Sequence, residues 1–87
     1  MAEYIVISNL VASRERLNPY RDEHLKYLEN LKKSGKLIMA GRFSDGSGGA
    51  YFLNASDINE AKVIADNDPY HLSGLRVYTL KEWERRF

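Results

Sequence analysis

Six segments of this 87-residue chain carry apolar residues with a regular period, and their order constrains the fold more than any other feature. Four short segments rich in β-branched and aromatic residues predict strands, at residues 3–11, 37–43, 50–54 and 75–80. Two longer segments repeat apolar residues at helical spacing, at residues 18–35 and 57–67. The order β-α-β-β-α-β predicts a ferredoxin-like α+β fold. Its four-stranded antiparallel sheet has the order 4-1-3-2, with both helices on one face.

The length predicts one domain over residues 1–87, which buries roughly 60–65% of its unfolded surface and is marginally stable alone. No cysteine is available for disulfides or thiolate metal sites, and the two histidines lack metal-ligand spacing, so we expect no metal and no cofactor. The first strand is apolar on both faces, with Tyr4 and Val6 on one and Ile5 and Ile7 on the other. We therefore expect a homodimer or higher homo-oligomer in which a second sheet covers the exposed face.

Capping and turn residues set the expected boundaries. Asn18-Pro19 predicts the start of the first helix and Gly35 its end, while Ser56 or Asp57 caps the second helix. The glycine-rich residues 44–49 predict a hairpin turn rather than a phosphate-binding loop, since they join strand to strand and lack the lysine of that motif. Residues 81–87 predict a helical turn or tail, whose Trp83 and Phe87 pack on the domain or on a partner chain.

A histidine lies near the centre of the most apolar stripe in the chain. On a helix over residues 17–35 this stripe comprises Leu17, Tyr20, His24, Tyr27, Leu28 and Leu31. A buried imidazole is costly unless its ring nitrogens are hydrogen-bonded. We predict that an Asp68 carboxylate oxygen, just after the second helix, lies within about 2.6–3.2 Å of the His24 ring or bonds to it through one water, at the edge of a pocket.

Such a pair can transfer protons near neutral pH. The carboxylate fixes the imidazole tautomer and stabilises the imidazolium, so His24 is the candidate acid or base and Asp68 its orienting partner. Arg21, about 60° from His24 on the helix, is placed to hold an anionic oxygen. Asp68-Pro69 is equally typical of a simple turn, and Tyr70 is expected either in the core or in the pocket wall. His71 is expected at the surface.

The chain resembles the YCII (YciI-like) family over about residues 4–77. The residues that carry the resemblance are Arg21-Asp22-Glu23-His24-Leu25, the Gly35–Leu37 step, Ala40-Gly41, the Asp45–Gly49 turn, Ala61, Asp68-Pro69-Tyr70 and Gly74. The resemblance implies a dimeric α+β barrel of ferredoxin-like subunits, related in shape to muconolactone isomerases. It also implies a His–Asp active site, at His24 and Asp68.

Most members of this family have no established reaction, and one branch removes chloride from chlorinated hydroxyhydroquinones. The resemblance thus implies a lyase, isomerase or dehydrochlorinase-like role on a small organic molecule. Arg42 departs from the proline that many members carry after the glycine, and this changes the pocket wall. We predict Arg21, Arg42 and Tyr70 as substrate-binding residues.

Two other hypotheses remain open beside the enzyme. The same dimeric barrel can serve as a non-catalytic module that binds a small molecule, or the pair can be structural, with a carboxylate satisfying a buried histidine. The net charge of +1 gives no bias toward nucleic acid. No segment is long and apolar enough for a membrane span and no signal peptide is evident, so we expect a cytoplasmic protein.

Overall fold

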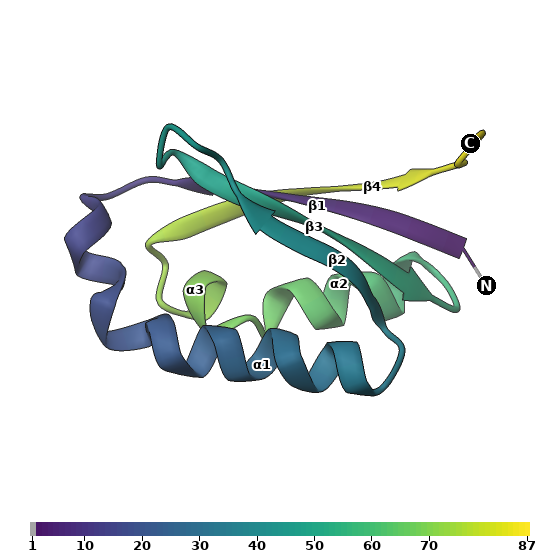
Figure 1. The fold of residues 1–87 in the computed structure, drawn as a ribbon, viewed down its shortest axis with the longest axis horizontal. Coiled ribbons are helices and arrows are strands. Elements are labelled where there is room, and N and C mark those ends of the chain that lie inside the picture. The colour runs from purple at the N-terminus through teal and green to yellow at the C-terminus, as the bar shows by residue number, and fades with distance from the viewer. Residues whose placement is uncertain (1) are drawn as a thin grey trace.

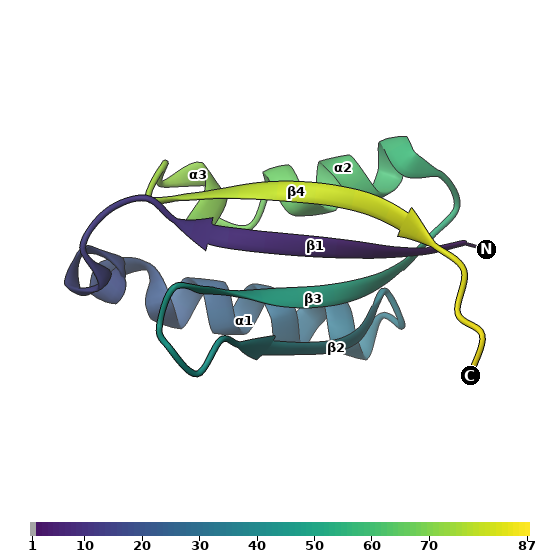
Figure 2. The ribbon, with the colours of Figure 1, turned by 90° about the horizontal axis from the view of Figure 1, so that it is seen from above.

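The structure is a computed structural model that describes residues 2–87. Its strands are β1 (Ala2–Leu10), β2 (Leu37–Arg42), β3 (Gly48–Ala55) and β4 (Arg76–Trp83). Its helices are the 3-10 helix η1 (Arg14–Tyr20) and the α-helices α1 (Arg21–Lys33), α2 (Ile58–Asp66) and α3 (Pro69–Leu72). The strands form one antiparallel sheet in the order β2-β3-β1-β4, and the helices cover one face (Figures 1 and 2). The predicted ferredoxin-like fold and its sheet order are confirmed.

The core lies between the sheet and the helices. On β1, Tyr4 and Val6 face the helices, where they stand opposite Leu53 and Tyr51 of β3, and all four side chains are buried. Further buried members of this core are Leu37, Ala55, Ala61, Ile64 and Ala65. The inward-facing residues of the strands thus pack against the apolar faces of α1 and α2, as the sequence pattern predicts.

The other face of the sheet is also apolar. The register pairs Ile5 with Phe52 and Ile7 with Ala50 on this outer face, because these residues alternate with the buried ones. Val77 of β4 lies on the same face, opposite Asn9, and is 54% exposed. Figure 1 shows that no helix of residues 2–87 covers this side of the sheet.

The first helix begins differently from the prediction. Asn18 and Pro19 lie inside η1 rather than at a helix start, and Tyr20 stands at the N-cap position of α1 without a side-chain capping bond. Tyr20 is 36% exposed, so its place in the buried stripe was predicted wrongly. The change from 3-10 to α geometry at this point alters the rotation per residue and turns Tyr20 away from the core. Gly35 ends the helix with φ of 78°, as predicted.

The second helix is capped as expected but ends earlier. The Asp57 carboxylate accepts the backbone N–H of Glu60, and Glu60 in turn accepts the backbone N–H of Ser56. Ile58, predicted on the inner face, is 44% exposed because it lies in the first turn, before the helix reaches the core. Asp68 does not end this helix: it caps the short helix α3, with Pro69 in the first turn.

Two of the strands extend beyond the predictions. β3 begins at Gly48, so the two last glycines of the predicted turn belong to the strand. β4 continues to Trp83, so the helical turn predicted as one alternative for residues 81–87 is wrong, and residues 84–87 form the tail predicted as the other. The pairing of Trp83 with Glu3 of β1 explains this, since each added residue gains a sheet partner. Trp83 packs on the domain, with its ring centroid 5.2 Å from that of Phe52, whereas Phe87 is fully exposed.

Candidate functional site

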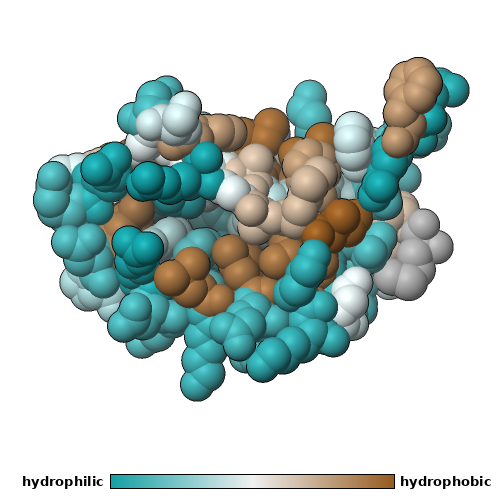
Figure 3. All heavy atoms as spheres, in the orientation of Figure 1, coloured by the Kyte–Doolittle hydropathy of each residue, from teal (hydrophilic) through white to brown (hydrophobic). Residues whose placement is uncertain are grey.

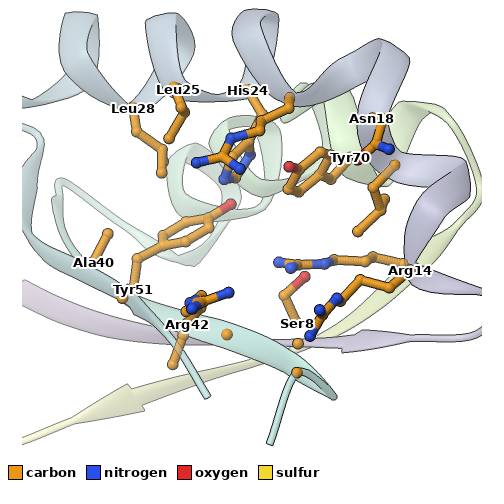
Figure 4. A pocket seen from close by; sticks show the side chains of 18 residues that line it. Ser8, Arg14, Asn18, His24, Leu25, Leu28, Ala40, Arg42, Tyr51 and Tyr70 are labelled. Atoms are coloured by element: carbon orange, nitrogen blue, oxygen red, sulfur yellow. The ribbon is translucent and has the colours of Figure 1, made fainter. Parts of the chain in front are cut away.

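A cavity of about 650 Å³ opens between the sheet and the start of α1. Figure 3 shows a hollow at this end of the molecule, among hydrophilic side chains and beside an apolar band. Its apolar wall includes Leu17, Leu25 and Leu28, and its polar wall includes His24, Tyr51 and Tyr70 (Figure 4). The volume is that of a site for a small organic molecule.

His24 and Asp68 are hydrogen-bonded, which confirms the predicted contact. The His24 Nδ1 atom lies 2.7 Å from the Asp68 Oδ1 atom, although the two residues are 44 positions apart. His24 is 8% exposed and lines the cavity, whereas Asp68 is 1% exposed and lies behind it. The arrangement matches an orienting carboxylate behind an imidazole that faces a binding space.

Asp68 is held by two further donors. The backbone N–H of Tyr70 donates to Oδ1 at 2.9 Å, and the Tyr51 hydroxyl donates to Oδ2 at 3.1 Å. Burial, the largest influence, disfavours the ionised carboxylate, but the hydrogen bond and charge of His24 and the Tyr70 N–H outweigh it. The pKa of Asp68 therefore lies below its ordinary value. The carboxylate is ionised at neutral pH.

An ionised carboxylate can only accept, so the Nδ1 atom of His24 carries the proton of this bond. In the neutral ring, Nε2 then bears the lone pair. Within residues 2–87 no protein group is hydrogen-bonded to His24 Nε2, and the side chain lines the cavity. A ligand in the cavity can therefore give a proton to this nitrogen, and the imidazolium that forms can return it.

Tyr70 is buried in the core and also forms part of the cavity wall, so both predicted positions of this residue hold together. Its ring stacks on the imidazole of His24, with centroids 3.8 Å apart and planes 12° apart. Figure 4 shows its hydroxyl pointing into the cavity. Burial raises the pKa of Tyr70, and the cations Arg76 and Arg21 oppose part of that shift. The hydroxyl therefore remains protonated at neutral pH and can donate to a ligand.

The two predicted substrate-binding arginines also line the cavity. Arg21 comes from the first turn of α1, and Arg42 from the end of β2. Both are exposed on one side, and Figure 4 shows Arg42 on the sheet side of the cavity, opposite His24. Their roles as ligands for a substrate stay predictions.

Sequence reasoning missed a second histidine contact. His71, expected at the surface, is half-buried: its Nδ1 lies 2.6 Å from the Ala65 carbonyl oxygen and its Nε2 lies 2.7 Å from the Ser8 hydroxyl. Because a carbonyl only accepts, Nδ1 carries the proton, and Nε2 of the neutral ring accepts from Ser8. Ser8 is 2% exposed and lines the cavity. The alternation of β1 places Ser8 on the inner face, but nothing in the sequence indicated its partner.

Tyr51 and Tyr27 were also missed as neighbours of the pair. Burial and the charge of Asp68 raise the pKa of Tyr51, so its hydroxyl stays a donor to that carboxylate. The same two causes raise the pKa of Tyr27 to about 12, and its hydroxyl donates to the Ile64 carbonyl at 2.7 Å. The inward phase of Tyr51 on β3 and the place of Tyr27 in the His24 stripe were the available signals.

Within residues 2–87, no group of three or more His, Asp or Glu side chains is placed to hold a metal ion. No helix here has the length and apolar character that a membrane span needs.

Comparisons with known proteins agree on one family. The profile described as "YCII-related domain" matches residues 1–84. The protein YjpA of Bacillus subtilis (strain 168), described as uncharacterised, is 41% identical over 61 residues, which are 70% of this chain and 72% of YjpA.

A solved structure with a similar fold is TftG, the 5-chloro-2-hydroxyhydroquinone dehydrochlorinase of Burkholderia phenoliruptrix AC1100, in complex with 2,5-dihydroxybenzoquinone. The TM-score is 0.80 and the sequence identity 23%, over 98% of this chain and 95% of that one. At this identity the similarity shows a common fold and nothing more about chemistry.

Proposed function

The chain belongs to the YCII family, and from that premise we propose that it is a small enzyme that uses His24 for acid–base chemistry on a small organic molecule. One observation carries the proposal. The His24 ring is fixed by Asp68 at 2.7 Å on the wall of a cavity, and its other nitrogen is left for a ligand. A purely structural histidine would not need a binding space beside it.

The proposed step is a proton transfer. Nε2 of His24 takes a proton from an acidic O–H or C–H bond of the substrate, and the electron pair of that bond stays on the substrate. Asp68 stabilises the imidazolium that forms, and the proton later returns to the product or to solvent. Return to another carbon makes the reaction an isomerisation. Departure of a leaving group with its bonding electrons makes it an elimination.

Elimination is the class to test first, because TftG, which shares the fold, is named a dehydrochlorinase. We propose a panel of chlorinated and hydroxylated hydroquinones together with small carboxylates that carry an acidic C–H bond. Chloride release, the absorbance of quinone products and proton exchange in D₂O report the possible outcomes.

The decisive variant is His24→Gln, which keeps a side chain of similar length without a titratable ring. We expect it to lower kcat by about 10²–10⁴ on any compound that the wild type converts. Lys26→Gln is the matched control, since Lys26 is exposed on α1 and does not line the cavity. Equal turnover by wild type and His24→Gln would contradict the proposal. Compounds that bind in the cavity with none converted would favour the non-catalytic binding module.

We also propose that the enzyme is a homodimer in which a second copy covers the outer face of the sheet. Ile7 and Phe52 of this face, and Met39 of β2 at 54% exposure, would otherwise remain in water. Ile7→Glu should convert a species of twice the 10.0 kDa chain mass into a monomer in sedimentation equilibrium. Val63→Glu, at an exposed position of α2, should not. A monomeric wild type at micromolar concentration would refute this.

We place the proposed enzyme in the cytoplasm. The absence of cysteine suits a reducing compartment. Fractionation of the source cells would test this location.

A further inference from the structure

Four arginines line the single cavity that contains His24. They come from four different elements: Arg14 from η1, Arg21 from α1, Arg42 from β2 and Arg76 from β4. Within residues 2–87, none of the four lies within ion-pair distance of a carboxylate. In contrast, Arg85 makes a salt bridge with Glu3 at 2.7 Å at the far end of the sheet. Four cations thus converge on one space without a counter-charge from the described chain.

This concentration of charge is not a property of the whole molecule. The net charge of the chain is +1, so removing these four positive charges leaves −3 for all other residues. Asp68 does not line the cavity, and it is 1% exposed and already bonded to His24 and Tyr51. Like charges that face one space repel each other and raise the local concentration of anions. The cavity is therefore a positive site on an otherwise acidic molecule.

Arg76 adds a second, independent observation. It is half-buried, its guanidinium lies 4.6 Å from the centroid of the Tyr70 ring, and its Nε atom is buried without a hydrogen-bond partner in residues 2–87. Burial lowers the pKa of Arg76, which shows that the charged form is poorly solvated there. A buried donor on a cation is costly until an acceptor reaches it. Arg76 lines the cavity, so an anion bound there would offset part of the cost of burying this charge.

Arg14 completes the geometry. Its guanidinium lies against the β2–β3 turn, so close to Gly46 that any side chain there would collide with it. Figure 4 shows Arg14 reaching into the cavity beside Ser8, on the side opposite His24. Figure 4 shows Leu25 and Leu28 of the apolar wall on the side of His24 that faces away from Arg14.

We infer that the end of the cavity formed by Arg14 and Arg76, with Arg42 and Arg21 beside it, binds an oxyanion group, a carboxylate or a phosphate, of a small organic ligand. The reacting atoms of that ligand then lie near Nε2 of His24, and its apolar part extends beyond them toward Leu25 and Leu28. The inference rests on the proposed function for the identity of the ligand as a substrate, but anion binding itself does not depend on turnover. Planar guanidinium groups suit both oxyanions, because they donate two parallel hydrogen bonds.

The test uses isothermal titration calorimetry at low ionic strength with three probes of similar size: benzoate, phenyl phosphate and the neutral benzamide. We expect the wild type to bind at least one of the two anions and not benzamide, and the stronger anion identifies the oxyanion class. Arg14→Gln and Arg76→Gln should each weaken that binding by about 10-fold to 100-fold, as expected for loss of a charge-assisted hydrogen bond.

Arg16→Gln is the matched control. Arg16 lies two residues after Arg14 in η1, is exposed and does not line the cavity, so its loss should change the affinity by less than about twofold. Arg76→Lys covers the case in which Arg76→Gln does not fold, because it keeps the positive charge and removes the planar fork. It should bind more weakly than the wild type.

Two results would overturn the inference: no binding of either anion by the wild type at about 10 mM, or equal weakening by Arg16→Gln and Arg14→Gln. The His24→Gln variant separates this inference from the proposed function. If it binds the anion normally and the wild type converts no compound, the anion site stands and the enzyme proposal fails.

Discussion

Replacing Asp68 with alanine should be among the most destabilising single changes in this chain. The carboxylate accepts hydrogen bonds from His24 Nδ1, the Tyr70 backbone N–H and the Tyr51 hydroxyl, at 2.7, 2.9 and 3.1 Å. Alanine leaves these donors without an acceptor in a place where Asp68 itself is 1% exposed. Each buried donor left without an acceptor costs about 1–3 kcal/mol. Water that enters from the cavity can bond to some of these donors, so the total cost for the three lies near the lower end of the range.

The expected loss is therefore about 3–5 kcal/mol in the free energy of unfolding. For a domain of this size, each kcal/mol corresponds to roughly 4–8 °C in Tm. Asp68→Asn retains one acceptor oxygen of the same shape and should cost less, about 1–2 kcal/mol. Urea denaturation followed by circular dichroism measures the free energy of unfolding of each variant. All variants are compared at the same protomer concentration, because association also contributes to stability.

Asp66→Ala is the control for this prediction. Asp66 lies two residues earlier and also accepts side-chain bonds, from Lys62 and Tyr78, but its side chain is 46% exposed. Its loss should cost at most about 1 kcal/mol. An Asp68→Ala variant that loses less than about 1 kcal/mol, or no more than Asp66→Ala, would refute the reasoning that the three donors depend on this carboxylate.

Three further predictions follow from individual contacts. The folded-state pKa of Asp68 is below its ordinary value, which is about 3.9 in the unfolded chain. Ionised Asp68 therefore stabilises the fold fully above that pH, and this stabilisation is lost as the pH falls through the lower folded-state pKa. The stability difference between wild type and Asp68→Asn should therefore shrink from about pH 5 to about pH 2, and a constant difference in urea titrations would contradict this. Ser8→Ala removes the donor to His71 Nε2 and should cost about 1 kcal/mol in urea denaturation, more than Ser34→Ala at an exposed site; equal costs would count against the contact. Gly48→Ala should destabilise by more than about 3 kcal/mol, because a Cβ there lies 2.0 Å from the Ser8 carbonyl oxygen at φ of 150°. Gly41→Ala is the control, because a Cβ at that position meets no other atom within 4 Å, and it should change the free energy of unfolding by less than about 0.5 kcal/mol. Similar thermal midpoints for the Gly48 and Gly41 variants would be inconsistent with this packing.

Local signals predicted the fold well because each one acts within a few residues. The alternation of β1, the cap at Asp57 and the positive φ of Gly35 all depend on neighbours in sequence. The errors arose where local rules competed. Pro19 is compatible with a helix start and with a 3-10 turn, and sequence alone did not separate the two. β4 extends because β1 offers it partners, which is a long-range effect.

The same distinction applies to the site. His24 and Asp68 could be paired from sequence, since one lies at the centre of a buried stripe and the other next to a helix end, and each side chain needs a partner. Ser8 and His71 lie 63 residues apart, and neither occupies a position that demands the other. Arg14 and Arg76 are likewise ordinary surface residues by pattern. Only the packing of η1 against α1 and α3, with Arg14 against the β2–β3 turn, brings them to one cavity.

The protonation state of His24 is the most direct test of the account. A long-range ¹H–¹⁵N correlation spectrum of protein labelled at histidine, recorded at about pH 8.5 where free imidazole is neutral, reports which ring nitrogen carries the proton. The same spectrum of Asp68→Asn is the comparison, and the histidine signal that changes in this variant is assigned to His24. We predict that His24, whose side chain lines the cavity, carries its proton on Nδ1, bonded to Asp68, and none on Nε2. A proton on Nε2, or a signal unchanged in Asp68→Asn, would contradict it.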